Sequence, residues 1–535
     1  MDRLVPRITD EAVLTVLSLA LGAATVPAVG EKKFTFLDSA ADVPDDLIAA
    51  TLEQIRLGND PLGTAFCNIR PASRRREDGA VYTPSVIVDA MLSRVEILGE
   101  PDRVVDPGAG SGRFLVEVGR RFPNAFLVAV ERDPLAALTT RANLAASGMA
   151  DRSEVRIENF LTSNLGQVNG RTLFIGNPPY VRHHLIPAKW KTWLKDQANA
   201  IGLQASALAG MHVYFFLAIA RCAGPGDYGA LITAAEWLDV NYGQLVRELF
   251  LSCLGGQSVH VIEPAAEPFP KTATTAAITT FTVNSKPSLV RFARVADLSC
   301  LGDLGGGRRV RRERLASEQK WSHFTHPAVV TPKGYVELGE LCRVHRGQVT
   351  GANHIWIAGE HSQGLPDRVL FPAVTRAREL IQTEPLLAST DGLRLVIDLP
   401  EDLSTLDGQS LAAVERFLVR AEKMGAKEGY VARHRLAWWS VRLRDPAPVL
   451  ATYMARRPPA FVLNETGARH LNIAHGLYPR ESMSPSLLSK LVSYLRQSSL
   501  VRGGRVYAGG LTKFEPREME RIPVPEPSLL MEMTM

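Results

Sequence analysis

The sequence has few cysteines, and no two of them lie close together in it. Its five cysteines are scattered along 535 residues, without the close spacing of zinc ligands or of a disulfide framework. This pattern excludes the disulfide-rich and zinc-finger classes of protein. It predicts no metal and fits a reducing compartment, here the cytoplasm.

Long apolar runs are also scarce. One run, EAVLTVLSLALGAATVPAVG, has the apolar length of a signal-peptide core, but Asp10 and Glu11 stand where a signal peptide carries positive charge. We therefore expect a buried helix there rather than an export signal. No other run reaches the roughly 18 apolar residues of a membrane span, so no membrane partner is expected.

A strong charge of one sign is missing too. The 61 basic and 56 acidic residues give a formal net charge of +5. This mild excess permits a polyanionic partner without identifying one. With 46% hydrophobic residues, the chain can bury a substantial core.

The pattern along the chain predicts several parts. Residues 1–75 are mainly helical in pattern, and 76–300 alternate short apolar strands with longer helices. That alternation predicts an α/β fold with a doubly wound parallel sheet, whose ligands bind at the carboxyl ends of the strands. The Gly- and Arg-rich residues 301–334 suggest a basic linker, and 335–535 suggest a second domain of mixed α+β structure.

A glycine-rich turn follows the first of these strands, in VVDPGAGSGRF. Asp106 ends the strand, and Gly108 and Gly110 permit close approach to a ligand, although NAD enzymes use a similar turn. Glu131 ends the next strand, 19 residues after Gly112 (131 minus 112), where an acidic residue can bind ribose hydroxyls. Acidic groups suit the ammonium and sulfonium of S-adenosylmethionine (SAM) better than a pyrophosphate.

Two further segments complete the predicted cofactor site. Asn159 and Phe160 follow the third strand, where one could bond to adenine and the other stack on it. Thr83 and Pro84 open a helix in the order of an N-terminal cap. Thr83 is therefore either a simple cap or a contact to the amino acid end of the cofactor.

The stretch LFIGNPPYVRHH ends the fourth strand with Asn177, Pro178 and Tyr180. The amide oxygen of Asn177 and the carbonyl of Pro178 can both accept N–H protons from a planar amine, while Tyr180 can stack on its ring. The motif by itself leaves DNA, RNA and protein amides open as substrates.

The series YTP, DPGAGSG, VERDP, NFL and NPPY resembles the gamma-class, TaqI-like N6-adenine DNA methyltransferases, and EPFPKTATTAAITTF resembles a later segment of that family. The resemblance implies a class I SAM-dependent methyltransferase fold, base flipping, and a modification role in a restriction-modification or related defence system. It makes Thr83, Asp106, Glu131, Asn159 and Phe160 cofactor contacts. Asn177, Pro178, Tyr180 and Phe269 become the catalytic pocket for the flipped adenine. Asn159 departs from the family, which usually has Asp there.

Double-stranded DNA is the partner that this resemblance implies. Three further segments resemble the target-recognition domain of the family: RGQVTGAN, FPAVTRARELI and GGLTKFEPREMERIPVP. The candidate DNA contacts, each of which could equally be a solvated surface residue, are Arg182, His183, Lys189, Arg308, Arg309, Arg346 and Lys513. A separate restriction endonuclease is a further candidate partner. Two alternatives stay open: a release-factor glutamine methyltransferase and a catalytically idle DNA-binding subunit.

Overall fold

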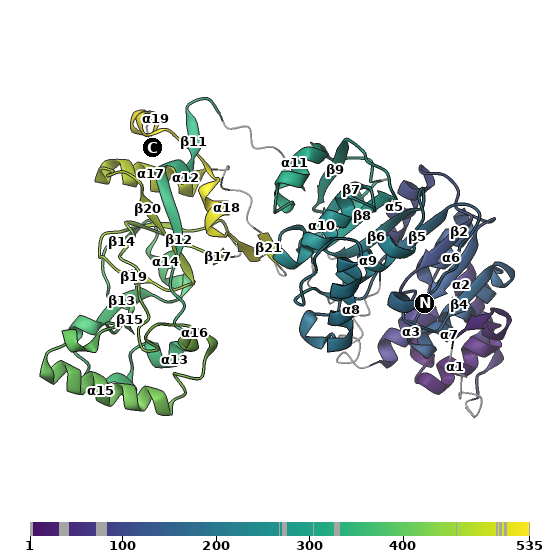
Figure 1. Cartoon of the computed structure of the whole chain (residues 1–535), viewed down its shortest axis with the longest axis horizontal. Helices are drawn as coiled ribbons and strands as arrows, with labels where there is room; N and C mark the ends of the chain where they lie inside the picture. The colour runs from purple at the N-terminus through teal and green to yellow at the C-terminus, as the bar shows by residue number, and fades with distance from the viewer. Residues whose placement is uncertain are drawn as a thin grey trace. The chain divides into compact units, whose positions relative to one another are not determined.

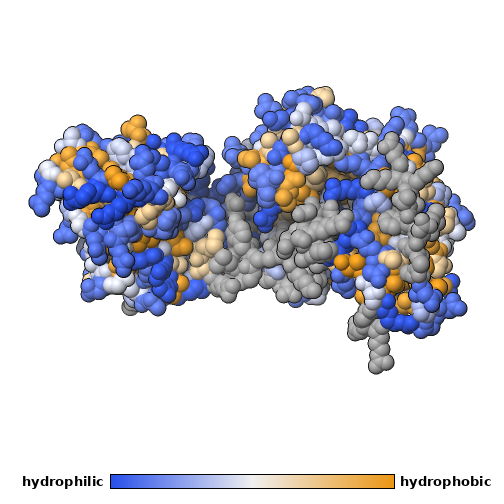
Figure 2. Space-filling model, turned by 90° about the horizontal axis from the view of Figure 1, so that it is seen from below, coloured by the Kyte–Doolittle hydropathy of each residue, from blue (hydrophilic) through white to orange (hydrophobic). Residues whose placement is uncertain are grey.

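In the computed structural model the chain forms two compact units, Met1–Pro327 and Ala328–Met535 (Figure 1). The structure describes residues 4–30, 42–70, 83–266, 268–269, 275–302, 304–325, 332–455, 457–498, 501, 505–507 and 511–533. In the view of Figure 2 both units present a mostly hydrophilic surface with scattered apolar patches. Within the described residues, no helix is long and apolar enough to cross a membrane.

A ten-stranded sheet forms the centre of the first unit, in the order β1-β4-β3-β2-β5-β6-β8-β7-β9-β10. The first six strands in this order are parallel, and β8 runs antiparallel to both of its neighbours. The strands are β1 (Ala28–Val29), β2 (Arg103–Asp106), β3 (Phe126–Val130), β4 (Ser153–Arg156), β5 (Thr172–Gly176), β6 (Tyr228–Ala234), β7 (Gly256–Ile262), β8 (Ala276–Thr282), β9 (Leu289–Val295) and β10 (Arg308–Arg311).

Helices cover both faces of this sheet. Alternate residues of one strand enter different apolar clusters: Val104 of β2 belongs to one and Val105 to the other. The helices are α1 (Glu11–Ala20), α2 (Asp45–Arg56), α3 (Pro61–Ile69), α5 (Ser85–Glu96), α6 (Arg113–Arg121), α7 (Pro134–Ala146), α8 (Ala188–Asn199), α9 (Met211–Cys222), α10 (Gln244–Leu251) and α11 (Arg312–Ser317). Strands buried on both sides explain the uninterrupted apolar runs in the sequence and confirm the predicted doubly wound sheet.

The apolar run near the N-terminus is a buried helix, as predicted. The Asp10 carboxylate caps α1 by accepting hydrogen bonds from the backbone N–H groups of Ala12 and Val13. Leu14 and Leu17 are fully buried, and α1 and α3 pack beside α7 (Figure 1). The acidic residue that argued against a signal peptide is therefore the helix cap.

The predicted basic linker differs from the structure. Arg308–Arg311 forms β10, which pairs antiparallel with β9 as the last strand of the large sheet, and α11 follows directly. Val310 and Leu315 are buried, while Arg309 and Arg311 are exposed. The stretch resembles a linker in sequence because charged side chains are also typical of an exposed edge strand. The other predicted domain boundaries stay predictions.

The second unit combines helices with several small sheets. A five-stranded sheet has the order β12-β20-β16-β18-β14, and the remaining sheets are β15-β13-β19, β17-β22-β21 and β11-β23. The strands are β11 (Tyr335–Glu337), β12 (Cys342–Arg346), β13 (Leu370–Val374), β14 (Leu386–Leu387), β15 (Arg394–Ile397), β16 (Val449–Thr452), β17 (Met454–Ala455), β18 (Phe461–Asn464), β19 (Arg469–His470), β20 (Ala474–Pro479), β21 (Arg505–Tyr507), β22 (Leu511–Lys513) and β23 (Pro523–Pro525). The helices are α12 (Leu338–Leu341), α13 (Asn353–Trp356), α14 (Ala377–Thr383), α15 (Gly408–Lys423), α16 (Tyr430–Arg433), α17 (Pro485–Gln497), α18 (Pro516–Glu520) and α19 (Pro527–Glu532).

Candidate active site

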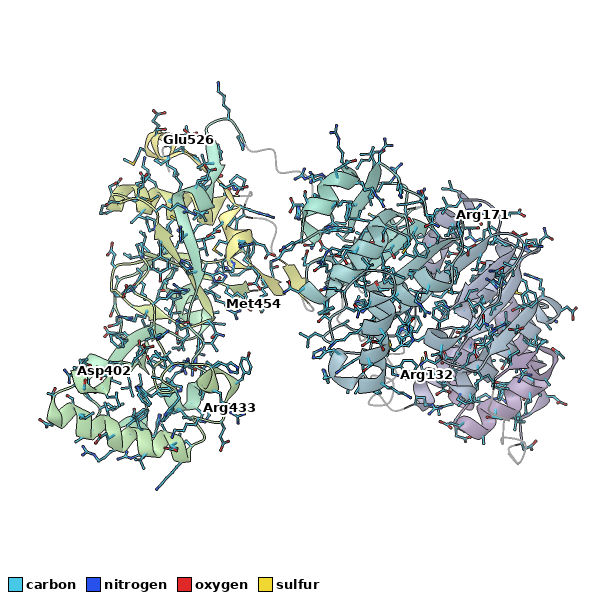
Figure 3. All side chains as sticks on the ribbon, viewed as in Figure 1. Arg132, Arg171, Asp402, Arg433, Met454 and Glu526 are labelled. Atoms are coloured by element: carbon cyan, nitrogen blue, oxygen red, sulfur yellow. The ribbon has the colours of Figure 1, made fainter. Side chains whose placement is uncertain are left out.

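A pocket opens at the carboxyl edge of the large sheet. Its walls come from the loops after β2, β3, β4 and β5, together with Thr83, Phe215 of α9 and residues of α3. Figure 3 labels Arg132, which follows β3, and Arg171, which precedes β5, at opposite edges of the sheet. Because Arg132 lines the pocket, the pocket lies at the edge of the sheet where Arg132 is found. This is the edge at which a doubly wound sheet binds ligands.

Glycines let the chain turn tightly and approach closely at this edge. Gly110 and Gly112 have φ of +57° and +79°, a left-handed conformation that favours glycine. At Gly176, the last residue of β5, an added Cβ would lie 2.4 Å from Asp106 Oδ1. A side chain there would force apart the ends of β2 and β5.

Asp106 is a buried carboxyl group under this pocket. One oxygen, Oδ1, accepts a hydrogen bond of 3.3 Å from the backbone N–H of Gly108, whereas Oδ2 is buried without a partner in the described structure. Burial raises the pKa of Asp106 to about 8, and the nearby Glu131 adds to the rise. An acid with an unsatisfied buried oxygen is suited to a cationic ligand.

Glu131 lies at the end of β3 and organises the loops around it. Its two carboxylate oxygens accept hydrogen bonds of 2.9 Å from the backbone N–H groups of Gly110 and Asp133. Burial raises its pKa, and these two hydrogen bonds oppose that rise. Each oxygen keeps a second lone pair, so the carboxylate can still accept from ligand hydroxyls.

Asn159 and Phe160 lie at the end of β4. The Asn159 side-chain oxygen accepts a hydrogen bond of 3.0 Å from the backbone N–H of Leu161 and so caps the short helix Phe160–Thr162. Asn and Asp cap helices about equally well, so this contact is compatible with either residue. The Phe160 ring stacks on Phe215, with centroids 5.6 Å apart, and both rings line the pocket.

Asn177 follows β5 directly, and its side chain is oriented by Thr83. The Asn177 Nδ2 donates a hydrogen bond of 3.0 Å to Thr83 Oγ1, and Thr83 is only 4% exposed. This bond turns the amide nitrogen toward Thr83 and the amide oxygen away from it. The structure therefore gives the Thr83 hydroxyl a partner that the sequence did not suggest.

Tyr180 and Phe269, the two predicted aromatic residues of the target pocket, contact each other but are not among the residues that line the pocket. Their rings meet edge to face, with centroids 5.6 Å apart and planes at 78°. Phe269 is 1% exposed, and the Tyr180 hydroxyl is buried without a hydrogen-bond partner in the described structure. Burial also raises the pKa of Tyr180, which stays a neutral phenol. Pro178, which follows Asn177 in the sequence, is also buried.

Helix α3 supplies part of the pocket wall, which no motif in the sequence indicated. It contributes Gly63, Phe66, Cys67 and, at its C-terminal end, Arg70. An added Cβ at Gly63 would lie 2.4 Å from Ser111 Oγ, so the helix packs directly on the glycine-rich loop. The only signal available was this glycine within a helical pattern.

A polar network fixes α3 to that loop. Ser111 Oγ donates a hydrogen bond of 2.5 Å to Asp60 Oδ2, and Asn143 Nδ2 donates one of 3.0 Å to Asp60 Oδ1. Asn143 Nδ2 also donates to the carbonyl of Ser111 at 2.9 Å. Asp60, the N-cap residue of α3, is thereby joined to the binding edge of the sheet.

Several predicted DNA contacts lie in the first unit but outside the pocket lining. Arg182 and Lys189 are exposed, with the Lys189 ammonium 5.3 Å from the ring centre of Trp190, and the rings of His183 and His184 meet edge to face. On β10, Arg309 is exposed and Arg308 lies 5.9 Å from the ring centre of Phe324. Their contacts with DNA stay predictions.

In the second unit, Arg346 and Lys513 come together at one ring. The Arg346 guanidinium lies 4.3 Å and the Lys513 ammonium 5.4 Å from the ring centre of Tyr453. Arg346 Nε also donates to the carbonyl of Asn472, and Lys513 pairs with Glu515 at 2.5 Å. Both cations thus already make a hydrogen bond or an ion pair with groups of the same unit.

In the portion of the chain that the structure describes, no group of three or more His, Cys, Asp or Glu side chains could hold a metal ion.

Two protein-family models match the chain. One is described as Type II methyltransferase M.Eco57I, C-terminal domain, and matches residues 327–534. The other is described as Eco57I restriction-modification methylase and matches residues 135–262. Their order along the chain follows the order of the two units.

Among known proteins, the chain is similar to the Type II methyltransferase M.XamI of Xanthomonas campestris pv. amaranthicola. The two are 52% identical over 466 residues, which cover 87% of each chain. This likeness extends through both units, and it confirms the family that the motif series predicted.

Two solved structures share the fold. The Type IIL restriction-modification enzyme MmeI, solved in complex with DNA, has a TM-score of 0.54 and 14% identity, covering 94% of this chain and 78% of its own. The type IIG restriction endonuclease BpuSI has a TM-score of 0.50 and 15% identity, covering 98% and 72%. The predicted fold class, a Rossmann-like methyltransferase sheet joined to a mixed second domain, is confirmed.

Proposed function

Since this chain belongs to the Type II methyltransferases of restriction-modification systems, we propose that it methylates the N6 amine of adenine within a specific sequence of double-stranded DNA. SAM is the proposed methyl donor. The observation that carries this proposal is the Asn177 side chain, oriented by Thr83 beside the pocket and followed by two prolines.

The neutral Asn177 suits a planar amine as its substrate. The lone pair of an exocyclic amine is delocalised into the ring, and the amine is too weak an acid for a general base to help. Acceptance of its N–H protons by Asn177 Oδ1 and the Pro178 carbonyl favours a pyramidal nitrogen that can attack a methyl group. A neutral amide also adds no competing charge beside a cationic donor.

The residues present fit SAM. The unsatisfied Asp106 Oδ2 is suited to its ammonium, Glu131 to the ribose hydroxyls, and Phe160 with Phe215 to the adenine ring. When bound, SAM supplies an activated methyl group on a sulfonium. The protein contributes the position and orientation of the groups around it.

The target adenine must leave the duplex to reach Asn177, at a cost of a few kcal/mol. We propose that Tyr180 and Phe269 take up the flipped base between them. Their edge-to-face contact in the free protein is then replaced by stacking on the base. We propose that the DNA backbone is bound by the second unit and by the basic residues Arg182, Lys189 and Arg309.

One experiment tests the reaction and the residue together. The wild-type protein and Asn177→Ala are expressed in a host without its own adenine methylation, and the host DNA is sequenced by a single-molecule method. We expect N6-methyladenine in one recognition sequence with the wild type and none with the variant. Equilibrium SAM binding by purified Asn177→Ala, expected to match the wild type, shows that the variant is folded.

The outcomes separate the alternatives. Undiminished methylation by Asn177→Ala contradicts the role of this residue, and methylation of another base contradicts the adenine assignment. SAM binding with no DNA methylation favours a protein amide substrate, as in release-factor glutamine methyltransferases. Failure of the wild type to bind SAM favours an idle DNA-binding subunit.

We further propose that DNA cleavage in this system belongs to a separate restriction endonuclease. The supporting observation is that the N-terminal segment contributes Gly63, Phe66, Cys67 and Arg70 to the wall of the pocket. Incubation of the purified chain with unmodified plasmid and Mg²⁺ tests this. Site-specific cleavage would contradict it.

A further inference from the structure

Arg70 brings a buried cation to the pocket wall. It lines the pocket and is only 7% exposed. Its Nε lies 3.2 Å from Glu11 Oε1, and its Nη2 donates to Asp133 Oδ2 at 3.3 Å. The guanidinium also lies 5.4 Å from the ring centre of Phe66, one turn earlier on α3.

Of the three guanidinium nitrogens of Arg70, Nη2 donates a hydrogen bond, Nε is only ion-paired with Glu11, and Nη1 has neither kind of contact among the described residues. Arg70 Nη1 is buried, and nothing in the described structure accepts a hydrogen bond from it. A buried charged donor without an acceptor is costly, because it has lost its hydration without compensation. An acceptor brought into the pocket by a ligand would remove that cost.

The contacts of Arg70 show which half of the pocket it serves. It is tied to Asp133, two residues after Glu131, and Phe66 lies beside it on the same helix. Glu131 is the proposed ribose contact. Asn177, the proposed reacting contact, follows a different strand, β5, and is held by Thr83.

We propose that α3 closes the pocket over the nucleoside half of SAM, with Arg70 Nη1 donating to a ring nitrogen or ribose oxygen and Phe66 covering the same half. This inference rests on the proposed function, since it takes SAM as the ligand. It gives the N-terminal helices a direct part in cofactor binding.

Two ligands and one variant test the assignment. SAM and 5′-methylthioadenosine share the nucleoside, but the second lacks the amino acid end. We expect Arg70→Met to weaken the binding of both ligands by the same factor, about 10- to 100-fold, because a hydrogen bond from a charged donor is lost.

A matched control comes from the same segment. Arg7 pairs with Asp46 at 2.9 Å, and both side chains are exposed. Arg7→Met therefore removes an N-terminal ion pair without touching the pocket, and both ligands should bind as they do to the wild type. Unchanged binding by Arg70→Met, or a loss confined to SAM, would overturn the proposal, since the second result assigns Arg70 to the carboxylate of the amino acid.

A measurement on the wild-type protein needs no variant. Cys67 lies on α3 and lines the pocket, whereas Cys222 and Cys300 are exposed and are not among the lining residues. We expect 5′-methylthioadenosine to slow alkylation of Cys67 by iodoacetamide at least fivefold, as measured by peptide mass spectrometry, and to leave the other two rates unchanged.

The proposed role of α3 and the proposed function can be contradicted separately. If Cys67 is not protected and Arg70→Met binds both ligands normally while the wild type still binds SAM, only the role of α3 is overturned. If the wild type binds neither SAM nor 5′-methylthioadenosine, the proposed function falls and this inference falls with it.

Discussion

The candidate site has two parts that differ in charge, an acidic half and a neutral half, and of their members Thr83, Glu131 and Asn177 line the pocket itself. The acidic half, Asp106 and Glu131, holds two carboxyl groups whose pKa values burial raises. The neutral half, Thr83, Asn177, Tyr180 and Phe269, has no charged side chain. The acidic half suits a cation and the neutral half suits an uncharged amine, so one edge of a sheet can hold both reactants of a methyl transfer.

The largest expected effect comes from the acidic half. Asp106→Asn should weaken SAM binding about 100-fold at pH 8, because a buried carboxylate facing the ammonium is lost. Calorimetric titration measures this. The affinity for 5′-methylthioadenosine, which has no ammonium, should not change. An equal loss for both ligands would place Asp106 outside the amino acid end.

The same carboxyl group predicts a pH dependence of stability. Between about pH 4, near the pKa of an unfolded Asp, and about pH 8, the folded protein holds this proton and the unfolded chain does not. The free energy of unfolding should therefore fall as pH rises through this window, by up to about 1.4 kcal/mol per pH unit. Urea unfolding of the SAM-free wild type and Asp106→Asn measures it. Parallel pH profiles for the two proteins would contradict the raised pKa.

Thr83 tests the boundary between the halves. The sequence predicts either a helix cap or a cofactor contact at this position. In the structure Pro84 is the N-cap residue of α5, with no side-chain cap, and the Thr83 hydroxyl accepts a hydrogen bond from Asn177. If that bond orients the amide, Thr83→Val should lower kcat about tenfold, roughly the cost of one hydrogen bond, with little change in SAM affinity. Thr83→Ser should restore kcat. A variant that loses SAM affinity and keeps kcat would favour the cofactor contact instead.

The smallest effect is expected deep in the neutral half. The Tyr180 hydroxyl has no partner in the described structure, so Tyr180→Phe keeps the ring and gives up no hydrogen bond. DNA methylation should stay within about threefold of the wild type. A loss above tenfold in steady-state kinetics would show that the hydroxyl binds the target base or its backbone.

The sequence correctly predicted which residues lie at this edge of the sheet where the prediction needed only a short motif at the end of a strand. Asp106 ends a short apolar strand, and Glu131, Asn159 and Asn177 each follow one, so parallel topology alone brings them to one edge. Apolar periodicity could be recognised without any long-range contact, whereas the order of the strands and the antiparallel β8 could not. The roles of these residues stay predictions.

The features missed by sequence analysis depend on long-range contacts. Arg70 reaches the pocket through Asp133, 63 residues away, and Asp60 reaches it through Ser111, 51 residues away. Neither pair has a sequence spacing that predicts it. β10 was mistaken for a linker because its arginines outnumber the one inward residue, Val310. The proximity of Arg346 and Lys513 likewise depends on a fold that local pattern does not specify.

The junction between α3 and the glycine-rich loop also has a consequence for synthesis. A ribosome makes α1, α2 and α3 well before α7, which carries Asn143 and follows Asp133. In the finished protein, α7 belongs to the same hydrophobic core as Leu14, Leu17 and Leu62. Until α7 is made, these leucines have no such surface to pack against. The nascent chain must therefore carry an apolar N-terminal segment for about 75 further residues, at roughly 5–20 residues per second. Chaperone binding to nascent chains should be greatest in that interval.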